Sequence, residues 1–444
     1  MSDLLEIPGE FKTWVLRRHR ILGKGNFGCA TLYEEVNNPG NFVVVKDVNM
    51  QTMKKEDEMK ALEMEVTILR RSRGHPNIVQ FLDYYHDGEF MAYIVMEYCE
   101  RGDLAKLEEE SKFRASHQSE SFVASVLIQM LAGLYFLHVD QHTLHRDIKP
   151  QNLFLCSDYT LRIGDFGVST ILEQFGSVAK AVCGSPFYMA PELCEEKAYD
   201  GKADIWSLGV TLYELMVMER PFDATSVPAL TRQITRGTYN PIPSDLPYSR
   251  QLVELVQSFL QVSTTTRPTL RRALRSTFVQ SHLSSLPLSC LESSHYSKLF
   301  GEDLIENAIK NIKKVDPKIN NGKGNNNRFE FSEKGNHTLV SSSPPNDMSE
   351  LEKWLETGKD AAEDFLGIGL QKREVTVGLG SNQRPNDSSI TEKQNFLTGS
   401  TPLDNISHQK QQQQQQLYPQ KNDAEEWDNA YEDDFESESS SNSQ

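Results

Sequence analysis

One short segment of the sequence carries three side chains that together suit phosphoryl transfer. It reads His145-Arg146-Asp147-Ile148-Lys149-Pro150-Gln151-Asn152. A carboxylate such as Asp147 can orient a hydroxyl, the Lys149 ammonium can neutralise a transferring phosphoryl group, and the Asn152 amide oxygen can bind Mg²⁺. The triplet Asp165-Phe166-Gly167 follows and adds a second oxygen ligand for the metal.

A lysine at the end of an apolar run is the next candidate, in Val43-Val44-Val45-Lys46. Such a lysine either extends from an edge strand into water or holds its ammonium beside nucleotide phosphates. The second role needs a carboxylate to fix the ammonium. Glu65 is the best-placed partner, on the apolar face of the helix that follows, whereas Glu58 and Glu63 point further from that face.

A glycine-rich segment precedes this lysine, with the sequence Gly23-Lys24-Gly25-Asn26-Phe27-Gly28-Cys29-Ala30. The pattern occurs in dinucleotide-binding folds, but there it joins a strand to a helix, and here two strand-like segments flank it. Glycines in a hairpin let backbone N–H groups approach a polyphosphate, and Phe27 can cap the loop tip. Phosphate binding and an ordinary glycine-rich hairpin both remain open at this point. For Cys29, a redox-sensing thiolate is the alternative to an inert loop cysteine.

The elements that must position these residues change character along the chain. Strands are predicted first, at Arg18–Gly23, Gly28–Val36, Asn41–Val48, Val79–Tyr85 and Met91–Tyr98. A helix is predicted over Lys54–Arg71, with Met59, Leu62, Val66 and Leu69 on one buried face. After residue 120 the pattern is mostly helical. We therefore expect an α+β fold with a small β-rich lobe, a larger helical lobe and a ligand between them.

The stretch Ser121–Val139 is apolar enough to resemble a membrane span. It is shorter than an ideal span and contains Ser125, Gln129 and His138. A buried core helix is therefore the better interpretation, and no membrane partner is expected.

Composition separates the first two thirds of the 444-residue chain from the last third. Most of the net charge of −17 comes from the last third, which argues against electrostatic binding of nucleic acid by the whole chain. The six scattered cysteines form no CxxC pair, which is typical of a reduced, intracellular protein. The first residues lack the profile of a secretory signal.

Residues 281–444 are predicted to be a low-complexity, polar and acidic tail that is largely disordered. It includes six consecutive glutamines, Gln411–Gln416, and an acidic end that could bind a basic partner or inhibit in cis. Two short helices are predicted, near 299–312 with Leu304, Ala308 and Ile312 on one face, and near 349–366. The alternative is that both form only transiently.

Further motifs follow in a fixed order: Ala190-Pro191-Glu192, Asp204-Ile205-Trp206-Ser207-Leu208-Gly209, and Arg267. The complete ordered set resembles the eukaryotic protein-kinase domain over about residues 17–280, with residues 1–16 as an N-terminal extension. Within that superfamily the chain resembles the NimA-related (Nek) kinases. The supporting stretches are HPNIVQFLDYY, YIVMEYCERGDLAKL, IGDFGVS and the segment KDVNMQTMKKEDEMKALEMEVTIL.

The resemblance implies the bilobal protein-kinase fold and a role for each matching residue. Lys46, paired with Glu65, would contact the ATP phosphates; Asp147 would orient the substrate hydroxyl and Lys149 would stabilise the γ-phosphate. Asn152 and Asp165 would hold Mg²⁺. The nucleotide would meet the glycine-rich segment, the gatekeeper Met96, the backbone of Glu97 and Cys99, the ribose ligand Asp103, and the apolar residues Leu22, Ala30, Val44 and Phe154. Structural roles are implied for a Glu192–Arg267 ion pair and for a column of Leu69, Phe166 and His145.

The resemblance also implies the substrate class. Lys149 and Ser185 are similar to the residues of Ser/Thr kinases rather than Tyr kinases. Protein substrates are expected, with cytoskeletal or ciliary partners and a cytoplasmic, cytoskeleton- or cilium-associated location by family resemblance. A pseudokinase, or a scaffold whose tail recruits partners, is the alternative.

Two positions depart from the family pattern. Ala181 stands where the family usually carries a phosphorylated Thr, and Thr170 stands where a basic residue often binds that phosphate. Acceptor and partner are therefore missing together, while Arg146 remains. We expect activity that does not depend on phosphorylation at position 181, with Ser177 as a candidate substitute acceptor.

Overall fold

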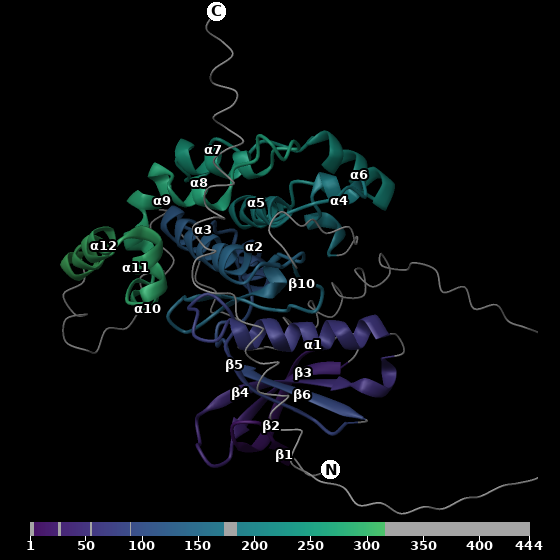
Figure 1. Ribbon diagram of the computed structural model, residues 1–444. Coiled ribbons are helices and arrows are strands. Elements are labelled where there is room, and N and C mark those ends of the chain that lie inside the picture. Colours follow the sequence, from purple (N-terminus) through teal and green to yellow (C-terminus); the bar gives the residue numbers. More distant parts are fainter. Residues whose placement is uncertain (1–3, 25–27, 54–55, 89, 173–183, 316–444) are drawn as a thin grey trace, which may run out of the picture. The chain divides into compact units, whose positions relative to one another are not determined.

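The computed structural model describes residues 4–24, 28–53, 56–88, 90–172 and 184–315, all of which lie in one compact unit. A β-sheet with one long helix forms the first lobe and a set of helices forms the second, as the sequence predicts (Figure 1). The predicted disordered tail and the predicted helix near 349–366 lie outside the described residues.

The first lobe contains a six-stranded antiparallel sheet in the order β1-β2-β3-β4-β6-β5. Its elements are β1 (Leu4–Pro8), β2 (Thr13–Lys24), β3 (Gly28–Glu35), β4 (Phe42–Asn49), η1 (Met50–Thr52), α1 (Glu56–Arg71), β5 (Phe81–His86) and β6 (Met91–Glu97).

The predicted N-terminal extension, residues 1–16, adds strand β1 and the start of β2 to this sheet. β1 pairs with the first part of β2, from Leu4 opposite Arg17 to Pro8 opposite Thr13. Ile7, Trp14 and Leu16 are buried in a second core cluster. They pack on Val43, Val45 and Val95, which lie on one face of β4 and β6. Burial of these large side chains favours the added strand.

The buried carboxylate of Asp83 in β5 fixes the turn between β1 and β2. It accepts backbone hydrogen bonds from Glu10 at 2.7 Å, from Phe11 at 3.2 and 3.3 Å, and from Lys12 at 3.3 Å. The Trp14 indole N–H donates to the same group at 2.9 Å. Gly9 must lack a side chain, because a Cβ there would lie 2.3 Å from Asp83 Oδ2.

Helix α1 buries Leu62, Val66 and Leu69, as its spacing predicts, while Met59 is half-buried. These side chains join a core that extends from the sheet into the helical lobe. The helix therefore has one face on the sheet, and its rotation determines where its polar residues point.

The second lobe is built from helices and four short strands. The longer helices are α2 (Leu104–Arg114), α3 (Glu120–Tyr135), α5 (Lys202–Val217), α6 (Val227–Arg236) and α7 (Arg250–Phe259). The short helical segments are η2 (Phe136–Asp140), η3 (Pro150–Asn152), η4 (Pro186–Tyr188), α4 (Pro191–Cys194), α8 (Leu270–Leu274), α9 (Thr277–Ser281) and η5 (Leu283–Ser285). The strands are β7 (Thr143–Leu144), β8 (Leu153–Leu155), β9 (Leu161–Ile163) and β10 (Thr170–Ile171).

The apolar segment predicted to be a core helix is α3 with its continuation η2. Among the described residues, Glu120–Asp140 alone has the length and hydropathy of a membrane span, and most of it is buried inside the protein. Nearly every residue of α3 is inaccessible, Ser125 and Gln129 included. Gln129 is satisfied there by accepting from Asn77 and from the Leu161 N–H. The prediction of a buried core helix is confirmed.

The folded part continues past residue 280, where the tail was predicted to begin. Helices α10 (Leu288–Leu291), α11 (Ser294–Phe300) and α12 (Glu302–Val315) follow. Tyr296 is fully buried, and its hydroxyl donates to Asn77 Oδ1 at 2.9 Å. One helix was predicted near 299–312, but Gly301, with a φ of 87°, separates two.

The buried face of α12 also differs from the prediction. It consists of Ile305, Ala308 and Ile312, whereas Leu304 is 39% exposed. A period of three to four residues fits a stripe that begins at either Leu304 or Ile305. Packing of α12 on η5, α10 and α11 buries the stripe that begins at Ile305.

His75 couples stability to pH at the point where the C-terminal helices meet the first lobe. Its ring stacks on Phe136 at a centroid distance of 4.3 Å and contacts His295 at 4.7 Å. Burial, with smaller contributions from His295 and Arg162, lowers the pKa of His75 from 6.5 to about 3. The unfolded chain therefore binds a proton before the folded chain does as pH falls below 6.5, and stability is lost.

We predict that the wild type loses about 2 kcal/mol more unfolding free energy than a His75→Gln variant between pH 7 and pH 5. Urea unfolding at both pH values measures the difference. Parallel losses in the two proteins would show that His75 is not the titrating group.

Candidate active site

The loop after β7 is held by a second buried carboxylate, that of Asp204 at the start of α5. Asp204 accepts the backbone N–H of His145 at 2.9 Å and of Arg146 at 2.8 Å, and it contacts His138 Nε2 at 2.8 Å. Burial opposes its charge, but these partners hold the pKa of Asp204 below its usual value. Arg146 has a φ of 68°, a backbone conformation that non-glycine residues rarely adopt. The hydrogen bonds to the Asp204 carboxylate therefore also maintain this conformation.

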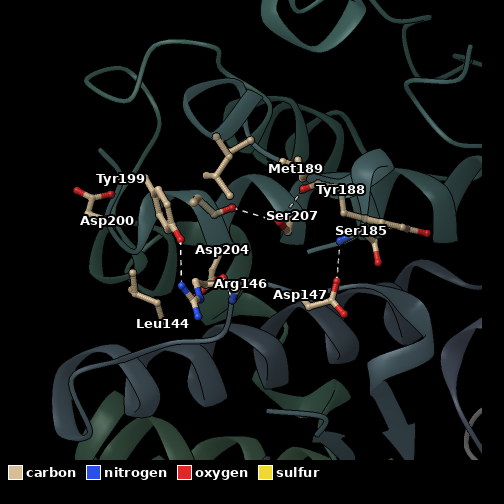
Figure 2. A pocket seen from close by; sticks show the side chains of 13 residues that line it. Leu144, Arg146, Asp147, Ser185, Tyr188, Met189, Tyr199, Asp200, Asp204 and Ser207 are labelled. Carbon is tan, nitrogen blue, oxygen red and sulfur yellow. Dashed lines mark hydrogen bonds between the residues drawn. The ribbon is translucent and has the colours of Figure 1, made fainter. Parts of the chain in front are cut away.

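Asp147 lies at the centre of the polar residues on this loop. Its Oδ2 is 2.7 Å from the Lys149 ammonium and accepts the Asn152 amide N–H at 3.0 Å. Its Oδ1 accepts the Ser185 backbone N–H at 2.9 Å, as Figure 2 shows. Although burial raises the pKa of Asp147, Lys149 and Ser185 bring it below its usual value, so the carboxylate is ionised at neutral pH.

The predicted partner of Lys46 is in place. The Lys46 ammonium, from β4, lies 2.6 and 2.9 Å from the two carboxylate oxygens of Glu65 on α1. Asp165 Oδ1 is 3.6 Å from the same ammonium. Burial disfavours the charged lysine, but Glu65 and Asp165 raise the pKa of Lys46, so it remains a cation. The pair joins the sheet, α1 and the segment after β9.

Asn152 and Asp165 offer oxygen donors that suit Mg²⁺. The Asn152 amide nitrogen donates to the Asp147 backbone carbonyl at 2.8 Å, which leaves its side-chain oxygen for a ligand. Asp165 has a φ of 63° and is half-exposed in its side chain, at 49%. In the described part of the chain, no group of three or more His, Cys, Asp or Glu side chains is arranged so that it could hold a metal ion. Two protein oxygens fit Mg²⁺ that also binds substrate phosphates.

Strand register places four of the predicted nucleotide contacts on one face of the sheet. Ala30 lies opposite Lys46, and Val44 lies opposite Met96. Because directly opposed residues and residues two apart share a face, Ala30, Val44, Lys46 and Met96 face the same side. The intervening valines face the core formed with residues 7–16.

Strand register says less about the remaining predicted nucleotide contacts. Leu22 is 39% exposed at the end of β2, and Phe154 lies in β8 in a bridge with Asp103. The Glu97 carboxylate lies 2.8 Å from the Arg162 guanidinium and accepts the Gln80 N–H at 2.7 Å. Because the side chain already has these partners, a ligand would contact the Glu97 backbone. Cys99 is buried near the Cys156 thiol, at 3.9 Å.

Asp103 has a structural role beside the predicted ribose contact. Its carboxylate caps helix α2 by accepting the Lys106 N–H at 2.9 Å. Substitution of Asp103 would therefore affect the helix as well as any ligand.

The glycine-rich segment is described only in part, because Gly25, Asn26 and Phe27 lie outside the described residues. Gly23 and Lys24 end β2, and Gly28 begins β3. A Cβ on Gly28 would lie 1.6 Å from the Asp47 carbonyl oxygen, so this glycine is required by strand packing. Burial raises the pKa of the Cys29 thiol, which contacts Asp47 at 3.2 Å. This environment disfavours the redox-sensing thiolate considered for Cys29.

Arg146 is the site residue whose partners sequence reasoning did not predict. Its guanidinium donates to the Val168 carbonyl at 2.5 Å, the Ser169 carbonyl at 3.2 Å and the Tyr199 hydroxyl at 3.3 Å. The last contact is drawn in Figure 2. The neighbouring Thr170 lies in β10, opposite Leu144. Positions 177 and 181, discussed for phosphorylation, lie outside the described residues.

The implied Glu192–Arg267 ion pair is present in the second lobe, and the three residues of the implied column are buried. Arg267 is fully buried, and its guanidinium forms two bonds with Glu192 at 2.8 and 3.0 Å. Leu69, His145 and Phe166 are all buried, with the two rings 5.1 Å apart. Both contacts join segments that are far apart in the sequence. They therefore fix the loop residues relative to the helices.

Comparison with known proteins relates this geometry to a family. A profile described as "Protein kinase domain" matches residues 16–279. The chain is 34% identical to serine/threonine-protein kinase Nek4 of Mus musculus, over 60% of this chain and 32% of that protein. It is 36% identical to serine/threonine-protein kinase Nek2 of Homo sapiens, over 58% of each chain. A probable serine/threonine-protein kinase nek3 of Dictyostelium discoideum is 36% identical, over 62% of this chain and 24% of the relative. In these three matches the chain spans from about a quarter to three fifths of the relative's length.

A Glu65→Gln substitution tests whether the ion pair holds Lys46 in its working position. We expect kcat/KM for ATP to fall about ten- to hundredfold, because the ammonium loses its charged anchor. Glu63→Gln is the matched control, since Glu63 is exposed on the same helix. Equal losses in the two variants would contradict a specific role for Glu65. Steady-state kinetics with varied ATP provides the measurement.

Proposed function

Because the chain belongs to the protein-kinase family and its kinase domain is similar to those of Nek serine/threonine kinases, we propose that it transfers the γ-phosphate of Mg-ATP to Ser or Thr hydroxyls of proteins. One observation carries the proposal: the Asp147–Lys149–Asn152 cluster and the Lys46–Glu65–Asp165 cluster each have all their members in contact.

The proposed mechanism assigns one task to each side chain. Asp147 is ionised and accepts the hydroxyl proton of the substrate as the new O–P bond forms. The bond between the γ-phosphorus and the bridging oxygen of ATP breaks in the same step, and ADP leaves. Lys149 lies beside Asp147 and stabilises negative charge on the transferring group. Lys46, fixed by Glu65, holds the nucleotide phosphates. Asn152 and Asp165 would hold Mg²⁺, which would supply positive charge next to the phosphate oxygens.

Contacts around Lys149 support Ser/Thr rather than Tyr specificity. The Lys149 ammonium donates to the Ser185 hydroxyl at 2.8 Å, while the Ser185 N–H bonds to Asp147. Ser185 therefore links Lys149 to Asp147, as the resemblance of these residues to those of Ser/Thr kinases leads us to expect.

The environment of Arg146 supports activity without a phosphate at position 181. In many kinases such an arginine binds a phosphate on the activation segment, but here two carbonyls and a hydroxyl accept its N–H groups. These contacts give the guanidinium alternative partners. We therefore propose that the unphosphorylated chain is active.

The pseudokinase or scaffold alternative predicts that transfer is absent although the fold is intact. The presence of every expected catalytic side chain favours the enzyme. By resemblance to Nek kinases we also propose cytoskeletal or ciliary partners and a cytoplasmic location, with the acidic tail binding a basic partner.

Transfer of phosphate from Mg-ATP to casein, after phosphatase treatment of the kinase, tests the proposed function. We expect activity from the wild type and a loss of about a thousandfold or more in Asp147→Asn, because the amide cannot accept the proton. ATP binding should be retained in this variant. Absence of transfer by a wild type that binds ATP would favour the scaffold, and transfer only before phosphatase treatment would contradict phosphate independence.

A further inference from the structure

The turn between β1 and β2 contacts the end of α1, the helix that carries Glu65. This turn comprises Gly9–Lys12 and precedes residues 16–279, the region matched by the kinase profile. Its backbone is fixed on β5 by the Asp83 carboxylate through the hydrogen bonds of Glu10, Phe11 and Lys12. These bonds come from the backbone, so they do not depend on the side chains of the turn.

Two side chains of the turn extend from this anchor to α1 and the residues just after it. The Glu10 carboxylate forms an ion pair with the Arg70 guanidinium in the last turn of α1. The Phe11 ring lies 4.9 Å from the Arg73 guanidinium carbon. Both interactions connect a segment near the N-terminus to the same end of the helix.

Arg70 is also held from the other side by β5. Its guanidinium carbon lies 5.5 Å from the Phe81 ring centroid and 5.8 Å from that of Tyr84. Glu10 and the two rings therefore determine where this side chain lies. Asp83, which anchors the turn, is on the same strand as both rings. The turn, β5 and the end of α1 form one connected unit.

The position of Arg70 relative to Glu65 shows how the turn, β5 and the end of α1 affect the Lys46–Glu65 pair. Residues five apart on an α-helix are separated by about 140° around the axis. Glu65 faces Lys46, whereas Arg70 faces the turn and β5. Contacts at two points on different sides of a helix restrict its rotation more than either contact alone. Rotation of α1 would withdraw Glu65 from Lys46.

We propose that Glu10, Asp83 and Arg70 form a positioning clamp that holds α1 in the rotation required for the Lys46–Glu65 pair. The proposal rests on the proposed kinase function, because the pair matters for binding ATP phosphates. The clamp acts through α1 and touches neither nucleotide nor substrate. It makes residues 4–12 part of the working kinase domain.

A Glu10→Lys variant tests the clamp, because it reverses one charge and leaves the backbone bonds to Asp83 possible. Glu6→Lys is the matched control: Glu6 is exposed in β1 and has no ion pair within the described ranges. We expect Glu10→Lys to lower kcat/KM for ATP about three- to tenfold relative to the control, with KM for casein unchanged. Combining Glu10→Lys with Arg70→Glu should restore the wild-type value within about twofold.

Hydrogen exchange of the full-length chain without nucleotide provides a readout that does not require activity. Amides of α1 should exchange faster in Glu10→Lys than in Glu6→Lys, and the charge swap should reverse the change. Equal exchange and equal kcat/KM in the two single variants would overturn the clamp, as would failure of the swap to restore either quantity. If the wild type transfers no phosphate, the proposed function fails, and the exchange comparison still decides the clamp.

Discussion

The ion pair between Lys46 and Glu65 is the constraint on which the rest of the active-site arrangement depends. Its members come from a strand and a helix, and their charges are largely removed from water. Such a pair is stable only when its geometry is well fixed, because desolvation costs as much as the attraction returns. The sheet register fixes Lys46, and the apolar face of α1 fixes Glu65. Asp165 then approaches the same ammonium from the second lobe.

Buried carboxylates fix the positions of backbone segments at two other places. Asp204 binds the backbone of the loop that carries Asp147, and Asp83 binds the backbone of the β1–β2 turn. In each case one buried charge is balanced by several N–H donors, which is the condition under which a buried charge is tolerated. Asp204 thus positions the loop that carries Asp147, whereas Asp83 positions the turn that contacts the end of α1. The positions of the site residues therefore depend on the Asp204 and Asp83 carboxylates.

Local patterns in the sequence predicted the Lys46–Glu65 pair, but not the contacts between segments that lie far apart in the chain. Asp147, Lys149 and Asn152 lie within one short segment, and Glu65 follows from helical periodicity, so both are local signals. Asp83 could not be identified, because its donors lie some seventy residues earlier in the chain. The alternation of apolar and polar residues that would have revealed β1 ends after a few residues, at Pro8 and Gly9. Ile305 rather than Leu304 is buried because helical periodicity allows a stripe that begins at either residue, and packing on the preceding helical segments decides between them.

We propose that the unphosphorylated chain holds the residues for Mg-ATP in the positions that binding requires. Calorimetric titration of ATP into phosphatase-treated wild type and Asp165→Asn, each with and without Mg²⁺, tests it most directly. We expect Mg²⁺ to tighten ATP binding about tenfold or more in the wild type and to have little effect in Asp165→Asn. An equal effect of Mg²⁺ on both proteins, or no ATP binding by the wild type, would contradict it.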